Sequence, residues 1–94
     1  MFENMIKKDK VVIFSKSWCE HSQDVKSLFK SLKQPYTAIE IDHRPDEEAL
    51  LIMLKKETGT KAVPKVYVNQ RFIGNAADVQ AMYRNGYLKK ILKS

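Results

Sequence analysis

A short apolar run, Val11-Val12-Ile13-Phe14, lies directly before a segment with helical periodicity, and this pair constrains the fold most. The run is apolar on both faces, as expected of a buried strand in a parallel pair. From Glu20 to Leu32, apolar residues recur on one helical face, at Val25, Leu28, Phe29 and Leu32. A strand, a helix and a further strand predict a right-handed crossover.

The rest of the chain continues this alternation. The patterns predict a strand over Tyr36–Ile41, a loop over Asp42–Pro45 and a helix over Ala49–Glu57, with Asp46 as its N-cap and Gly59 at its end. They next predict a tight hairpin of Val66–Val68 with Arg71–Ile73, which Gly74 breaks. Two helices follow, over Ala77–Tyr83 and Tyr87–Leu92. We therefore predict an α/β fold, a central four-stranded mixed sheet flanked by helices, in a single domain spanning residues 1–94.

Composition excludes several classes of protein. A single cysteine rules out an intramolecular disulfide and a multi-cysteine zinc site. Seventeen basic and eleven acidic residues give a net charge of +6, which favours anionic partners. No apolar run approaches the roughly 20 residues of a membrane span, and the first residues contain no apolar signal-peptide core. We expect no membrane association and a cytoplasmic protein.

Cys19 lies at the predicted junction between the first strand and the first helix. The unpaired amides and the dipole of a helix N-terminus stabilise a thiolate, and Lys16 adds positive charge nearby, as would a protonated His21. A thiolate is the nucleophilic form of cysteine. The alternative is a small buried apolar residue, which the polar neighbours of Cys19 disfavour.

Ser22 occupies the position of the second cysteine of a Cys-x-x-Cys motif. Its hydroxyl either donates a hydrogen bond to the Cys19 thiolate or caps the helix. A serine here fits either a natural monothiol protein or a dithiol protein whose second cysteine was replaced.

Two further segments have alternative interpretations. Val63-Pro64 is either a plain strand start or a cis bond that turns the Val63 backbone outward to pair with an extended peptide. Gly74 to Asp78 forms either a turn with an N-cap or a site in which helix amides hold a carboxylate and Asp78 holds an ammonium group.

These motifs together resemble the glutaredoxins, which have the thioredoxin fold. The resemblance runs from about Lys10 to about Leu92 and rests on three segments, Phe14–Ser22, Thr58–Pro64 and Gly74–Asp78. The chain lacks the loop insertion and the Trp-Pro motif of the Cys-Gly-Phe-Ser class. It is therefore more similar to the classical, dithiol-type branch, here with a Cys-x-x-Ser active site.

The resemblance implies a glutathione site. Cys19 matches the nucleophile, Lys16 and Lys61 match residues that hold the glycine carboxylate of glutathione, and Val63 before a cis Pro64 matches the backbone that pairs with the glutathione cysteine. Ala77 and Asp78 match the positions that hold the γ-glutamyl end of glutathione. This sequence departs from the family pattern at four positions, which bears on affinity and substrate preference. His21 replaces a tyrosine, Ala62 replaces a threonine, Asn75 replaces a glycine and Leu51 replaces a glutamine.

The activity so implied is that of a glutathione-dependent thiol-disulfide oxidoreductase. Its partners would be glutathione and glutathionylated proteins, and one thiol suffices for a monothiol mechanism through Cys19. We expect a monomer. The alternative is a dimer that binds a [2Fe–2S] cluster through Cys19 and glutathione.

Two other classes of partner are not expected. The lysines of the first and last helices are spaced as solvated faces without interleaved aromatic residues, so we expect no nucleic-acid partner. Nothing in the sequence places His43 near Cys19 and His21, so we expect no metal site.

Overall fold

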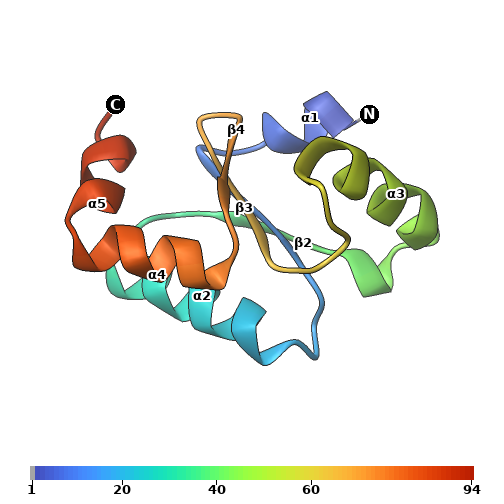
Figure 1. The fold of residues 1–94 in the computed structure, drawn as a ribbon, viewed down its shortest axis with the longest axis horizontal. Helices are drawn as coiled ribbons and strands as arrows, with labels where there is room; N and C mark the ends of the chain where they lie inside the picture. Colours follow the sequence, from blue (N-terminus) through green and yellow to red (C-terminus); the bar gives the residue numbers. More distant parts are fainter. Residues whose placement is uncertain (1) are drawn as a thin grey trace.

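A four-stranded mixed sheet forms the centre of the computed structural model, which describes residues 2–94 (Figure 1). Its strands are β1 (Val11–Ser15), β2 (Thr37–Glu40), β3 (Lys65–Val68) and β4 (Arg71–Gly74), in the order β2-β1-β3-β4. Strands β1 and β2 are parallel, whereas β3 is antiparallel to both β1 and β4. The predicted mixed sheet is therefore confirmed.

Helices cover both faces of this sheet. They are α1 (Phe2–Ile6), α2 (Glu20–Ser31), the 3-10 helix η1 (Ile41–His43), α3 (Glu47–Thr58), α4 (Ala76–Arg84) and α5 (Tyr87–Leu92). Figure 1 shows α2 and α4 side by side on one face and α1 and α3 on the other. None of the helices within residues 2–94 has the length and hydrophobicity needed to cross a bilayer.

Strand β1 separates two hydrophobic clusters because all five of its residues are buried. Alternate side chains of a strand point to opposite faces. Val12 and Phe14 therefore pack in the cluster beneath α1 and α3, whereas Val11 and Ile13 pack in the cluster beneath α2, α4 and α5. The run Val11–Phe14 is apolar at every position because each face of β1 packs against a different hydrophobic cluster.

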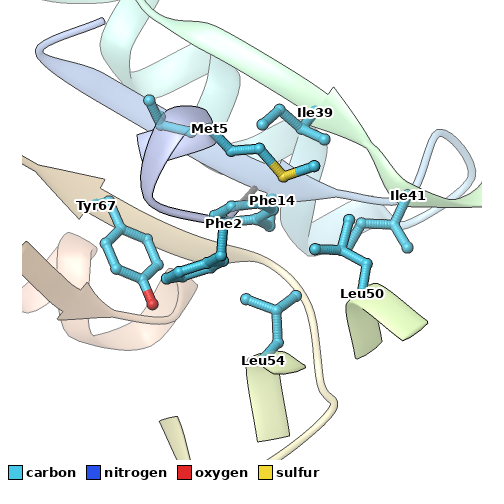
Figure 2. Packing of buried hydrophobic residues seen from close by; sticks show 9 residues of the cluster. Phe2, Met5, Phe14, Ile39, Ile41, Leu50, Leu54 and Tyr67 are labelled. Atoms are coloured by element: carbon cyan, nitrogen blue, oxygen red, sulfur yellow. The ribbon is translucent and has the colours of Figure 1, made fainter. Parts of the chain in front are cut away.

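Helix α1 was not predicted from the sequence. Its five residues bury Phe2 and Met5 against the sheet (Figure 2). The ring of Phe2 stacks on Phe14 at 5.7 Å between centroids and meets Tyr67 edge-on, also at 5.7 Å. Phe2, Met5 and Ile6 have the i, i+3, i+4 spacing of one helical face, but five residues are too few for this spacing to predict a helix, so tertiary packing supports it.

The predicted boundaries around β2 need correction. Ile41 belongs to η1 and not to the strand, and the predicted loop after it begins as this 3-10 turn.

Asp46 is the N-cap residue of α3 but makes no capping hydrogen bond with its side chain. Its carboxylate instead accepts from Arg44, at 2.8 Å from Nε and 3.1 Å from Nη2, and this pairing lowers the pKa of Asp46. Gly59 ends α3 with a left-handed φ of 92°, as predicted.

The hairpin turns through Asn69 and Gln70, whose φ angles of 52° and 67° are both left-handed. This conformation is that of a two-residue type I′ turn, which matches the twist of the flanking strands. The prediction that Gly74 breaks the hairpin is wrong, because Gly74 is the last residue of β4 and pairs with Val66.

Candidate active site

Cys19 is the N-cap residue of α2 and lies in the loop that follows the carboxyl end of β1. Its backbone is extended, its amide donates to the Lys16 carbonyl at 3.0 Å, and its own carbonyl accepts from Gln23 at 3.1 Å. The side chain is half-buried and the thiol is free. The thiol thus lies at the N-terminal end of a twelve-residue helix, where the helix dipole is positive.

The Val63–Pro64 peptide bond is cis and lies opposite this thiol. The Cys19 thiol donates a weak hydrogen bond to the Val63 carbonyl over 3.9 Å. Pro64 is buried directly before β3, and the next residue, Lys65, is only 4% exposed. The Lys65 ammonium donates to the Thr60 hydroxyl at 2.5 Å, which fastens the loop to the strand, and burial lowers the pKa of Lys65.

A pocket of about 200 Å³ lies beside the cis bond. It joins the first turn of α2, the loop before β3 and the first turn of α4, through His21, Ala62, Val63, Pro64, Asn75, Ala76 and Ala77. Four predicted site residues thus line one cavity: His21, Val63, Pro64 and Ala77. A larger cavity, about 440 Å³, lies between the hairpin and α5, at the opposite end of β1 from Cys19.

The two predicted basic residues lie outside this lining. Lys16 follows β1 in the loop before Cys19, where its ammonium lies 4.0 Å from Glu47 and 5.5 Å from the ring centroid of Trp18. The Trp18 side chain is 73% exposed, directly before the thiol. Lys61 is exposed in the loop before Val63. Their roles toward a carboxylate stay predictions.

Ser22 is completely buried in the first turn of α2. Its hydroxyl has no hydrogen-bond partner among residues 2–94. Neither interpretation from the sequence is therefore realised in this structure, because the hydroxyl neither caps the helix nor bonds to the Cys19 sulfur. Its place in the chemistry stays a prediction.

Asp78 takes part in a capping box at the start of α4. The Asn75 side chain accepts from the Asp78 amide at 3.1 Å, and an Asp78 oxygen accepts from the Asn75 amide at 3.0 Å. The turn with an N-cap, one of the two interpretations of this segment, is thus observed. Asp78 and Ala77 are both exposed beside the pocket, and their assignment to the γ-glutamyl end of glutathione stays a prediction.

Sequence analysis missed Asp42. Its carboxylate bonds to Ser17, two residues before Cys19, although the segment is expected to be a simple loop. The signal was present, since the carboxyl ends of two parallel strands meet at one edge of a sheet and the residues that follow β1 and β2 are therefore neighbours. His43, the next residue, is exposed and contacts Asp42.

A free thiol at a helix N-terminus, opposite a cis-proline on a mixed sheet, is typical of thioredoxin-fold proteins. The family model of glutaredoxin matches residues 11–73. This chain belongs to the glutaredoxin family.

Individual relatives agree with this family. Glutaredoxin-C4 of Arabidopsis thaliana is 36% identical over 87 residues, which are 93% of this chain and 64% of the relative. Chloroplastic monothiol glutaredoxin-S12 of the same plant is 40% identical over 83 residues, which are 87% of this chain and 46% of the relative. The chain thus spans about half to two thirds of the length of these two relatives.

A solved structure of the family is also similar to this one. The crystal structure of a buckwheat glutaredoxin–glutathione complex superposes with a TM-score of 0.95 at 32% identity, covering 98% of this chain and 84% of that one.

Proposed function

We propose that this protein is a glutathione-dependent oxidoreductase that reduces protein–glutathione mixed disulfides by a monothiol mechanism. The observation that supports it best is the position of the Cys19 sulfur, 3.9 Å from the Val63 carbonyl and at the N-terminus of α2. The complex of the buckwheat relative supports glutathione as the ligand. The name of monothiol glutaredoxin-S12 supports a route that uses one thiol.

The first step is attack of the Cys19 thiolate on the glutathione sulfur of the mixed disulfide. A bond forms between these two sulfurs, the original disulfide breaks, and the protein thiolate leaves and takes up a proton. The positive end of α2 stabilises the Cys19 thiolate before attack. The Val63 backbone, adjacent to the sulfur, is placed to pair with the glutathione cysteine in an extended conformation.

The second step restores the thiol. A second glutathione, as thiolate, attacks the glutathione sulfur of the Cys19 adduct, releases oxidised glutathione and leaves Cys19 reduced. The net reaction consumes one reduced glutathione: the disulfide between the substrate protein and glutathione is exchanged for that of oxidised glutathione, and the substrate protein leaves as its thiol. Since the sequence has one cysteine, no intramolecular disulfide competes with this step.

A coupled assay with a glutathionylated peptide tests the proposal. We expect turnover by the full chain, complete loss in Cys19→Ser, and unchanged turnover in Ile52→Ala, whose side chain is exposed on α3. Full activity of Cys19→Ser would overturn the mechanism. Visible absorption of anaerobically purified protein addresses the alternative, because a coloured dimer without turnover would favour the [2Fe–2S] function.

A further inference from the structure

The Asp42 carboxylate accepts two hydrogen bonds from Ser17, in the loop that leads to Cys19. One oxygen accepts from the Ser17 amide at 3.0 Å and the other from the Ser17 hydroxyl at 2.5 Å. Hydrogen bonds to an ionised acceptor are stronger than neutral ones, and a pair of them fixes orientation as well as distance. The Asp42 side chain is only 17% exposed, whereas Ser17 lies exposed at the surface.

The same loop is fastened at a second point. The Gln23 side chain donates to the Ser17 carbonyl at 3.1 Å, so both backbone groups of Ser17 are bound. The Cys19 amide bonds to the Lys16 carbonyl at 3.0 Å, so the loop closes into a turn around Ser17. Displacement of Ser17 therefore displaces the turn from which the Cys19 sulfur reaches the Val63 carbonyl.

We propose that Asp42 is a positioning residue for the thiol chemistry, which holds the Ser17 turn so that the Cys19 sulfur lies at the helix N-terminus and against Val63. The proposal rests on the proposed function for its turnover prediction. The two bonds from Ser17 keep Asp42 ionised by lowering its pKa. The Nε2 atom of the exposed His43 imidazole lies 3.7 Å from the Asp42 carboxylate.

Positioning and direct electrostatics predict opposite results. A negative charge near a thiol disfavours the thiolate, so if Asp42 acted through its charge alone, its removal would make Cys19 more reactive. If Asp42 acts through Ser17, its removal lets the turn move away from the helix N-terminus, and Cys19 becomes less reactive. The sign of the change therefore separates the two roles.

The experiment measures the alkylation rate of Cys19 by iodoacetamide across pH in the 94-residue chain. We expect Asp42→Ala to slow alkylation at neutral pH and to reduce kcat roughly tenfold. Asp42→Asn retains an acceptor for the Ser17 amide, so it should fall between wild type and Asp42→Ala. The matched control is Asp46→Asn, which removes a neighbouring carboxylate that bonds to Arg44 instead. It should leave the alkylation rate unchanged.

A second variant tests the route through Ser17. Ser17→Ala removes only the hydroxyl bond, and we expect it to slow alkylation in the wild-type background but not further in Asp42→Ala. Additive effects, or alkylation in folded Asp42→Asn that is unchanged or faster, would overturn the proposal. If Asp42→Ala fails to fold, Asp42→Asn and Ser17→Ala decide. Because alkylation needs no glutathione, absence of turnover in the wild-type chain would overturn the proposed function alone.

Discussion

The sulfur of Cys19 lies 3.9 Å from the carbonyl oxygen of Val63, a residue 44 positions later in the chain. This contact joins the N-terminus of α2 to the loop before β3. It places the thiol beside the pocket that Val63, Pro64, His21 and Ala77 line. The thiol and the pocket together form the site that the proposed chemistry requires.

Filling the pocket should separate binding from thiol reactivity. Ala77 is exposed and lines the pocket, so Ala77→Trp should obstruct it without disturbing the core. We expect KM for a glutathionylated peptide to rise by about tenfold, which corresponds to roughly 1.4 kcal/mol of binding. Alkylation of Cys19 by iodoacetamide should not change. The control is Ala81→Trp, one turn further along α4 and also exposed. Equal KM values for the two variants would show that the pocket does not bind substrate.

Removing the Ser22 hydroxyl should stabilise the fold. The hydroxyl is buried without a partner among the described residues, and an unsatisfied buried polar group costs about 1 kcal/mol or more. We expect Ser22→Ala to raise the free energy of unfolding in urea by about this amount. A decrease would mean that the hydroxyl has a partner in solution, with the Cys19 sulfur as the first candidate.

Gly74 should tolerate no side chain. Its φ is +136°, and a Cβ there would lie 2.4 Å from the Cβ and a carboxylate oxygen of Asp78. Gly74→Ala therefore combines backbone strain with disruption of the capping box, and we expect a loss of about 3 kcal/mol in the free energy of unfolding. In Gly59→Ala the new Cβ meets nothing within 4 Å, so only the left-handed φ is penalised, by roughly 1 to 2 kcal/mol. Similar losses in the two variants would contradict the clash.

The two hydrogen bonds that Asp42 accepts from Ser17 should also make the free energy of unfolding depend on pH. The Ser17 hydroxyl first, and then the Ser17 amide, lower the pKa of Asp42 from its ordinary value of 3.8. A carboxyl group with a lowered folded-state pKa stabilises the protein above the unfolded value and loses this contribution as pH falls through the folded value. We expect wild type to exceed Asp42→Asn in the free energy of unfolding at about pH 6, and by less at about pH 3.

Urea unfolding of both proteins at the two pH values measures this difference. Repeating it in the Ser17→Ala background provides the control, since the hydroxyl is the largest cause of the lowered pKa. There the advantage at the higher pH should shrink. A difference between wild type and Asp42→Asn that is the same at both pH values would contradict the linkage.

The sheet and its main helices were predictable because their patterns are local. The doubly buried run of β1 and the periodic apolar face of α2 need no knowledge of the rest of the chain. Helix α1 was not predictable, because it is stabilised by the burial of Phe2 and Met5 in a cluster whose other members are distant in the sequence.

The site divides in the same way. Cys19 and the cis bond before Pro64 were predicted from sequence motifs and family resemblance, and the structure places them together. The bond from Asp42 to Ser17 depends on the parallel register of β1 and β2, which aligns Ser15 with Glu40. Ser22 neither caps the helix nor bonds to the Cys19 sulfur, because its hydroxyl is completely buried and has no partner among residues 2–94.

Mass spectrometry after incubation with oxidised glutathione tests the central claim most directly. Thiolate attack by Cys19 on oxidised glutathione forms a mixed disulfide and releases one glutathione. The proposed mechanism predicts a single glutathione adduct, located on Cys19 by peptide mapping, reversed by excess reduced glutathione and absent from Cys19→Ser. A folded protein that stays unmodified while its thiol still reacts with iodoacetamide would contradict the account.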